Sequence, residues 1–103
     1  MLEVKIITAY PDMFPGALGC SVVGNALEEK KWSLDIINLH NFGYDERKSI
    51  DDEPFGGGPG MIIRPDVVEK ALLSLESHTQ IKRKLIYLTP SGNPLKQSNL
   101  SEF

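Results

Sequence analysis

Segments typical of buried β-strands alternate with segments typical of helices along this chain, and that alternation limits its fold more than any other feature. Glu3–Thr8 has β-branched residues around a continuous apolar centre, and Ser33–Leu39 has the same character. Between them, apolar residues from Val22 to Leu27 recur at the spacing of one helix face, and a charged end follows. A strand, a helix and a strand in this order predict a crossover unit, which is the connection that parallel strands require.

The alternation continues in the second half of the chain. Pro65 suits the first position of a helix, and an apolar helix face follows it to about Glu76. Leu85–Leu88 predicts a further strand that ends in a turn rich in proline and glycine, and Ser98 or Asn99 is expected to cap another helix. We therefore predict an α/β fold with a mostly parallel sheet and flanking helices.

That last helix has barely begun when the sequence ends. A natural domain rarely ends on the first apolar residues of an element, so we expect residues 1–103 to be the N-terminal part of a larger domain.

Composition places the chain among ordinary globular domains. Hydrophobic residues make up 41% and charged residues 24% of it, which argues against a disordered or fibrous protein. Its longest apolar runs are as short as Met61–Ile63, far below the roughly 20 residues of a membrane-spanning helix. The N-terminus also lacks the basic start and long apolar stretch of a secretory signal. We expect a cytoplasmic protein without a membrane partner.

Charge and cysteine content add little. A net charge of −3 argues weakly against a nucleic-acid partner, because such binding draws its affinity from neutralised phosphates. Basic residues do gather at Lys30–Lys31, Arg47–Lys48 and Lys82–Lys84, which permits contact with RNA without showing it. The single cysteine, Cys20, has no partner for an internal disulfide, and we predict that it is a small core residue facing a helix.

The most informative stretch is rich in glycine. Four glycines and two prolines fall within the seven residues Pro54–Gly60, and such a backbone can approach a ligand closely. The glycines lack the Gly-Lys-Ser/Thr of a phosphate loop and the third glycine of a dinucleotide fingerprint. The surrounding residues, Asn41–Gly60, show no periodicity, and ordered loops of that length are usually functional. A plain flexible loop is the alternative.

The run from Asp51 to Met61, DDEPFGGGPGM, closely resembles the signature of bacterial tRNA (guanine-37-N1) methyltransferases, members of the knotted SPOUT class. Tyr10–Phe14 and Ile86–Gly92 are similar to further landmarks of that family, in the same order, so the resemblance covers about residues 2 to 103. The chain departs from the family at Arg47–Lys48, where a histidine and a basic residue are frequent, and at Phe55, where tyrosine is frequent. No role that needs those side chains is carried over.

The resemblance implies that the parent protein transfers a methyl group from S-adenosylmethionine to N1 of guanosine 37 in tRNA, as a homodimer that builds each active site from both subunits. The donor would lie in a pocket at a deep trefoil knot, made of three loops. This chain holds only the first of them, with the implied donor-binding residues Tyr87, Leu88, Thr89, Pro90 and Gly92.

The resemblance also implies a substrate site. Adjacent carboxylates before a glycine-rich turn are usually turn-capping, solvated residues, whereas the family favours a role in the guanine pocket or the dimer seam. The implied substrate-binding residues are Asp51, Asp52, Pro54, Gly56, Gly57, Gly58 and Gly60. Family members are reported to need magnesium, yet no ligand spacing identifies a site, and we assign no metal ligand.

Catalysis at N1 of guanine needs a base for the proton on that nitrogen. The family assigns the base to an aspartate assisted by an arginine, and both would lie beyond Phe103. No catalytic residue is therefore assigned here, and the chain alone is expected to be inactive.

Two other classes stay open. One is a nucleotide- or sugar-phosphate-binding enzyme of another α/β family, which would need a helix to start directly after the glycines, although Met61–Ile63 has strand character. The other is a non-catalytic interaction domain that uses the loop for pairing, and such a protein would not bind the methyl donor.

We predict that the glycines are required for their shape, because a Cβ atom would restrict their dihedrals or occupy space that the ligand needs. In the full-length protein, Gly57→Val or Gly58→Val should abolish methyl transfer, whereas Phe55→Tyr in the same segment should have a much smaller effect. Transfer of labelled methyl to tRNA measures all three variants. Near-normal rates in the valine variants would show that the segment is only a linker.

Overall fold

The fold, taken from a computed structural model that describes residues 1–52, 62–76 and 83–102, is built on a parallel pair of strands. Strand β1 (Leu2–Thr8) pairs with β2 (Trp32–Asn38) over seven residues each, from Leu2 opposite Trp32 to Thr8 opposite Asn38. The connection contains two 3₁₀ turns, Pro11–Met13 and Gly16–Gly19, and helix α1 (Ser21–Glu28). The predicted strand, helix and strand of a parallel crossover are confirmed.

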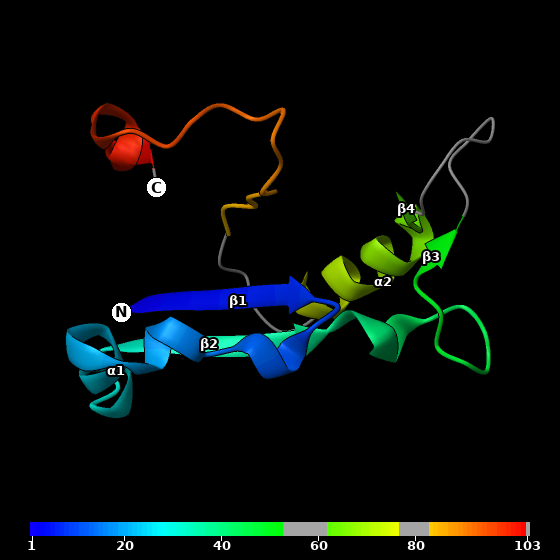
Figure 1. Cartoon of the computed structure of the whole chain (residues 1–103), viewed down its shortest axis with the longest axis horizontal. Helices are drawn as coiled ribbons and strands as arrows, with labels where there is room; N and C mark the ends of the chain where they lie inside the picture. The colour runs from blue at the N-terminus through cyan, green and yellow to red at the C-terminus, as the bar shows by residue number, and fades with distance from the viewer. Residues whose placement is uncertain (53–61, 77–82, 103) are drawn as a thin grey trace.

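Helix α1 lies beside the start of β2 (Figure 1). The indole Nε1 of Trp32 donates a hydrogen bond of 3.0 Å to the carbonyl oxygen of Val23, which ties the helix to the first residue of the strand. Lys5 of β1 and Asp35 of β2 form an ion pair of 2.9 Å across the sheet. The first contact ties the crossover helix to the amino end of β2, and the second joins the middle of the two strands.

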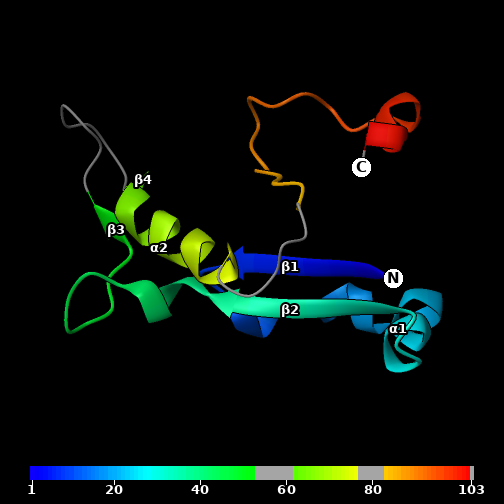
Figure 2. The same ribbon diagram turned by 180° about the vertical axis from the view of Figure 1, so that it is seen from behind.

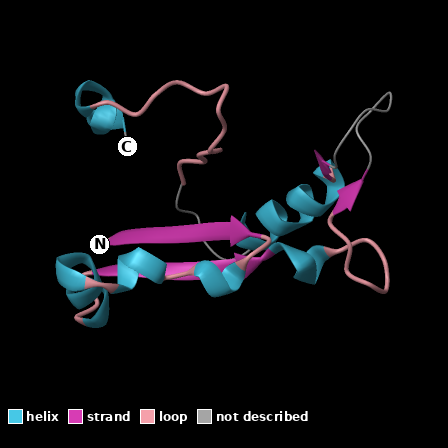
Figure 3. Cartoon of the chain, in the orientation of Figure 1, coloured by secondary structure: helices cyan, strands magenta, loops and turns pink. Residues whose placement is uncertain are grey.

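The remaining elements follow from the carboxyl end of β2. A 3₁₀ turn (Leu39–Phe42) leads to strand β3 (Asp51–Asp52), which pairs antiparallel with β4 (Ile62–Ile63). Helix α2 (Pro65–Glu76) comes next and confirms the helix predicted from Pro65. Figure 3 shows the short β3–β4 pair beyond one end of α2, away from the parallel strands.

A small apolar core joins these parts at the carboxyl end of the sheet. Four buried side chains form it, Leu39, Ile50, Val67 and Ala71. Partly buried hydrophobic residues from β1, from its end, from the 3₁₀ turn and from α2 surround them, namely Ile7, Ala9, Phe42 and Val68. Since Ile50 directly precedes β3 and Val67 lies in the first turn of α2, the core holds both ends of the β3–β4 region on the sheet.

Three predictions from the sequence are wrong or need adjustment. Leu85–Leu88 is not a strand, because no described segment offers it a hydrogen-bonded ladder, and all four side chains are exposed. Cys20 is exposed rather than in the core, since it is the extended N-cap residue of α1. The last helical segment, the 3₁₀ helix Gln97–Glu102, starts before Ser98, and the Asn99 side chain instead accepts a hydrogen bond of 2.9 Å from the Lys96 amide.

The chain is open for its size. Its accessible surface is 8663 Å², whereas a compact monomer of this mass has about 5,800 Å². Its radius of gyration is 16.1 Å, against about 13 Å for a compact domain of this length. Segment 85–102, orange to red in Figure 1, lies apart from the sheet and from α2 in both Figure 1 and Figure 2. Among the described residues, no helix is long and apolar enough to cross a membrane.

Gly24 provides a test of the α1 packing. It is buried in α1, and a Cβ atom built on it would collide with the backbone carbonyl of Gly19. Helix propensity alone would make Gly24→Ala stabilising by about 1 kcal/mol. We expect destabilisation by roughly 1–3 kcal/mol instead, because the clash forces a backbone shift.

Urea unfolding followed by circular dichroism measures the change, with the exposed Asn25→Ala of the same helix as control. A more stable Gly24→Ala variant would show that α1 and the Gly16–Gly19 turn do not touch as described.

Candidate functional site

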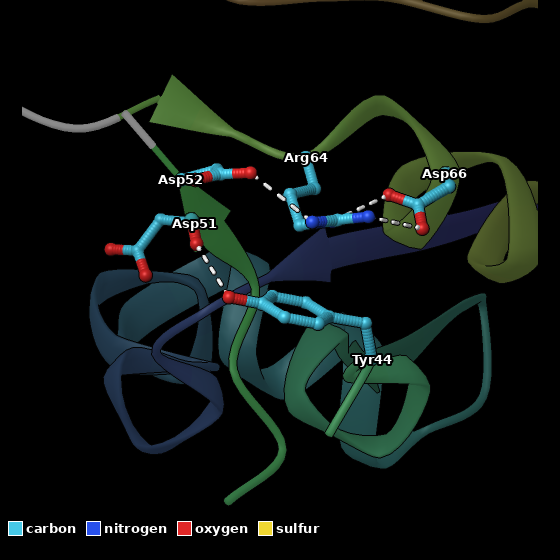
Figure 4. Close-up of polar contacts among 5 residues, drawn as sticks. All are labelled: Tyr44, Asp51, Asp52, Arg64 and Asp66. Carbon is cyan, nitrogen blue, oxygen red and sulfur yellow. Dashed lines mark hydrogen bonds and ion pairs between the residues drawn. The ribbon is translucent and has the colours of Figure 1, made fainter. Parts of the chain in front are cut away.

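The candidate site is a group of five polar and aromatic residues at the base of the β3–β4 pair, called here the Arg64 cluster (Figure 4). Its members come from different elements. Tyr44 follows the 3₁₀ turn after β2, two aspartates form β3, Arg64 links β4 to α2, and the last residue lies in the first turn of α2. The cluster consists of Tyr44, Asp51, Asp52, Arg64 and Asp66.

Backbone pairing sets the positions of these residues. Asp51 lies opposite Ile63, and Asp52 lies opposite Ile62. The amide of Arg64 donates a further hydrogen bond of 2.7 Å to the carbonyl oxygen of Ile50, whose side chain is only 6% exposed. The apolar core therefore fixes where the aspartates and the arginine meet.

The Arg64 guanidinium binds both a residue before it and a residue after it in the sequence. Its Nε and Nη2 donate to the two carboxylate oxygens of Asp66 at 3.0 and 3.2 Å, and its Nη1 donates to Asp52 at 3.1 Å. Its Cζ lies 4.0 Å from the centroid of the Tyr44 ring. A lysine cannot make this arrangement, because only the planar guanidinium offers a fork to a carboxylate together with a face for an aromatic ring.

These contacts also keep Arg64 and Asp66 ionised. The hydrogen bonds from Arg64 lower the pKa of Asp66, and the same bonds raise the pKa of Arg64 above its usual value. The position of Asp66 in the first turn of α2 adds the favourable interaction of a carboxylate with a helix N-terminus. Arg64 and Asp66 therefore both stay charged at neutral pH.

The adjacent aspartates differ in their surroundings. The Asp52 carboxylate is ion-paired with Arg64, whereas the Asp51 side chain points away from Arg64 (Figure 4). The Tyr44 hydroxyl donates to the backbone carbonyl of Asp51 at 3.4 Å. Within the described part of the chain, no hydrogen bond or ion pair reaches the Asp51 carboxylate. Among the described residues, the Asp52 carboxylate is thus bound by Arg64, and the Asp51 carboxylate is left to accept hydrogen bonds from a ligand.

The short loop before β3 orients Tyr44. The Tyr44 amide donates to the carbonyl oxygen of Ser49 at 3.1 Å, and the Asp45 side chain accepts from the Ser49 amide at 2.9 Å. That Ser49 amide lowers the pKa of Asp45. The exposed Arg47 and Lys48 lie in the same loop. Arg47 and Lys48 therefore lie exposed in the loop that contains Tyr44, but they are not members of the cluster.

The expected donor segment has only local structure. The Gly92 amide donates to the Thr89 carbonyl oxygen at 3.1 Å, and the Ser91 amide donates to Thr89 Oγ1 at 3.4 Å, so residues 89–92 form a turn. Before it, the Tyr87 and Leu88 side chains are 84% and 88% exposed. Segment 85–102 and the β3–β4 pair lie apart in Figures 1 and 2, so the structure does not bring the two expected sites together.

Several expectations fall on residues that the structure does not describe, namely Pro54, Gly56, Gly57, Gly58 and Gly60. Ile62–Ile63 forms a strand and α2 starts only at Pro65, so no phosphate-binding helix begins directly after the glycines. In residues 1–52, 62–76 and 83–102, no three metal-ligating side chains gather into a group that could hold an ion.

Sequence reasoning missed three members of the cluster, Tyr44, Arg64 and Asp66. A weak signal was present, because Arg64 interrupts the apolar stretch between Ile62 and Val67 and precedes an acidic residue in the first turn of a predicted helix. Tyr44 gave no such signal, since it lies in a stretch without periodicity.

Comparisons with known proteins place the sequence beside one family. Residues 2–103 match the family described as tRNA (Guanine-1)-methyltransferase TrmD. A tRNA (guanine-N(1)-)-methyltransferase of a Wolbachia species from Brugia malayi is 49% identical over 95% of this chain and 41% of its own length. The corresponding protein of Ehrlichia ruminantium (strain Gardel) is 46% identical over 94% of this chain and 41% of its own length.

A solved structure gives the same result. The crystal structure of a tRNA (m1G37) methyltransferase from Aquifex aeolicus superposes with a TM-score of 0.63 at 26% identity, covering 72% of this chain and 33% of its own. The chain spans about two-fifths of the length of the two curated relatives, 41% of each.

The pKa of Asp66 gives a pH-dependent prediction. A carboxyl whose pKa is lower in the folded state stabilises the fold at neutral pH, and this contribution is lost as the pH falls through the folded-state value. Asp66→Asn should therefore lower the urea midpoint at pH 7 and differ little from the original protein at about pH 2.

Urea titrations at several pH values measure this convergence, with the exposed Glu69→Gln of the same helix as control. A difference that stays constant with pH would contradict the charged contact between Asp66 and Arg64.

Proposed function

This chain belongs to the tRNA (Guanine-1)-methyltransferase TrmD family, and on that premise we propose that it forms the N-terminal part of an enzyme that methylates N1 of guanosine 37 in tRNA. The match over residues 2–103 carries the proposal. The fold agrees with it, because the parallel sheet with helices is that of the SPOUT class predicted from the sequence. The methyl donor is S-adenosylmethionine, as expected for a methyltransferase of this family.

The reaction has two requirements. The proton on guanine N1 must be removed while the methyl group moves in line from the sulfonium, and the charge that develops on guanine O6 must be stabilised. We assign neither task to a residue of this chain. On this proposal the base and its assisting arginine lie beyond Phe103 in the parent enzyme. That enzyme is a homodimer, and each of its active sites is built from both subunits.

On this proposal the β3 region contributes to the guanosine site. Asp51 and Asp52 lie on the rim of the site, and the Arg64 cluster holds that rim on the core through Ile50. Carboxylate oxygens suit the guanine edge, because the exocyclic amino group of guanine is a hydrogen-bond donor, whereas N1–H is left to the base. The residues of the proposed guanosine site are Asp51, Asp52, Pro54, Gly56, Gly57, Gly58 and Gly60.

The donor binds against the turn at residues 89–92. A ligand of this size needs convergent walls that bury most of its surface. The exposure of Tyr87 and Leu88 fits a segment that forms one wall of a pocket at a trefoil knot and needs others to close it. The donor-contacting residues are Tyr87, Leu88, Thr89, Pro90 and Gly92. The chain alone is inactive on this proposal, and the complete enzyme works in the cytoplasm, where tRNA is found.

The test is methyl transfer by the protein expressed from the complete reading frame that encodes this sequence. We expect labelled methyl to be transferred to tRNA transcripts with guanosine at position 37 and not to the same transcripts with adenosine there, because adenine N1 carries no proton and no O6 lies beside it. The 103-residue chain alone is the matched control and should transfer none. Equal labelling of the guanosine and adenosine transcripts would overturn the proposed function.

A further inference from the structure

We propose that Arg64 is a positioning residue that gives the two adjacent aspartates different roles: it anchors Asp52 and thereby leaves Asp51 as the carboxylate presented to guanosine. This inference rests on the proposed function and refines it.

Arg64 itself is fully engaged. Three of its N–H groups are used by Asp66 and Asp52, one face of its guanidinium lies over Tyr44, and its side chain is 31% exposed. A guanidinium in this position cannot turn towards a substrate without breaking several contacts at once. Arg64 therefore acts through its neighbours rather than by touching RNA.

The strand geometry separates the aspartates. Successive side chains of a strand point to opposite faces, so only one residue of β3 can face Arg64. Asp52 takes that side, and the Asp51 side chain lies on the other side of the strand (Figure 4). The hydrogen bond from Tyr44 to the Asp51 carbonyl holds the backbone at that point. Tyr44 also stacks on Arg64, so the same two residues fix both aspartates.

Charge decides what the available carboxylate can bind. Arg64 carries one positive charge, while Asp52 and Asp66 carry two negative charges, so the group is already negative before Asp51 is added. Such a surface repels the phosphates of tRNA and favours the N–H donors of a base edge. No described residue forms an ion pair with the Asp51 carboxylate, which can therefore accept those hydrogen bonds, whereas the Asp52 carboxylate is paired with Arg64. Asp51 is therefore the carboxylate suited to guanine.

Arg64 also connects this site to the body of the protein. Its fork to Asp66 reaches the first turn of α2, and its backbone amide binds the carbonyl of Ile50 in the core. A change at Arg64 should thus loosen the orientation of β3 without unfolding α2. This separates a positioning role from a purely structural one.

The test uses the protein from the complete reading frame with the variants Asp51→Asn, Asp52→Asn, Arg64→Gln and Arg64→Lys. We expect the first three to lower kcat/KM for the guanosine-37 transcript by about tenfold or more, because a small misplacement of a substrate contact costs that much. Arg64→Lys should recover part of the loss. Lys70→Gln, which removes an exposed charge from α2, is the matched control and should behave as the original protein.

Two further measurements distinguish positioning from general damage. The dissociation constant for S-adenosylmethionine should change little in all variants. The melting temperature should stay the same in Asp51→Asn and fall only slightly in Arg64→Gln, which also loses its hydrogen bonds to Asp66. The double variant Arg64→Gln with Asp52→Asn should lose no more activity than Arg64→Gln alone, since the contact between Arg64 and Asp52 is already broken in Arg64→Gln. Losses that multiply, or an Asp51→Asn enzyme with normal kcat/KM, would overturn the proposal.

A measurement without catalysis keeps this inference separate from the proposed function. In ¹⁵N nuclear magnetic resonance spectra of the 103-residue chain, the backbone amides of Asp51 and Asp52 should shift in Arg64→Gln and not in Lys70→Gln. If the original enzyme fails to distinguish guanosine from adenosine, the proposed function is wrong. If the two amides do not move, the positioning role of Arg64 is wrong, whatever the enzyme does.

Discussion

The burial of Ile50 beside Leu39, Val67 and Ala71 is the constraint on which the candidate site depends. This small core seals the carboxyl end of the β1–β2 pair and fixes both the start of β3 and the start of α2. Burial of a valine, leucine or isoleucine side chain contributes about 1.5–3 kcal/mol, more than an exposed ion pair. The core therefore decides where the chain lies, and the polar contacts of Arg64 refine the geometry of what is already in place.

The Arg64 cluster and the donor segment differ in how firmly they are attached to the rest of the protein. Within the cluster, Arg64 is joined to Asp52 and Asp66 by hydrogen bonds and ion pairs, and it is tied to the core through Ile50 and α2. Arg83, two residues before segment 85–102, forms an ion pair of 3.2 Å with Glu3 of β1, whereas apolar side chains of the segment such as Leu85 and Leu88 are exposed. Burying that surface is favourable, so a donor pocket built on this segment requires walls from elsewhere. The open shape of the chain and the proposed inactivity of the chain alone have this same cause.

The family assignment and the site assignment come from different kinds of information. The family was recognisable from a contiguous run, Asp51 to Met61, because a glycine-rich sequence with fixed neighbours is specific without any knowledge of the fold. The site needed contacts between residues distant in sequence. Asp52 is 12 residues from Arg64, and no periodic pattern links them. Tyr44 belongs to an aperiodic loop and meets Arg64 only because Asp45 and Ser49 close that loop.

The sequence by itself determined β1, α1, β2 and α2 to within a few residues, because periodicity and helix-start residues such as Pro65 act over short distances along the chain. It also determined the parallel order of the first two strands, through the length of their connection. Tertiary structure alone decided that Leu85–Leu88 is not a strand, since a strand needs a partner and not only β-branched and apolar residues. It also decided that Cys20 lies at the surface and that Asp51 and Asp52 differ. Each of these three outcomes depends on contacts between residues that are far apart in the sequence, and local sequence preferences do not predict such contacts.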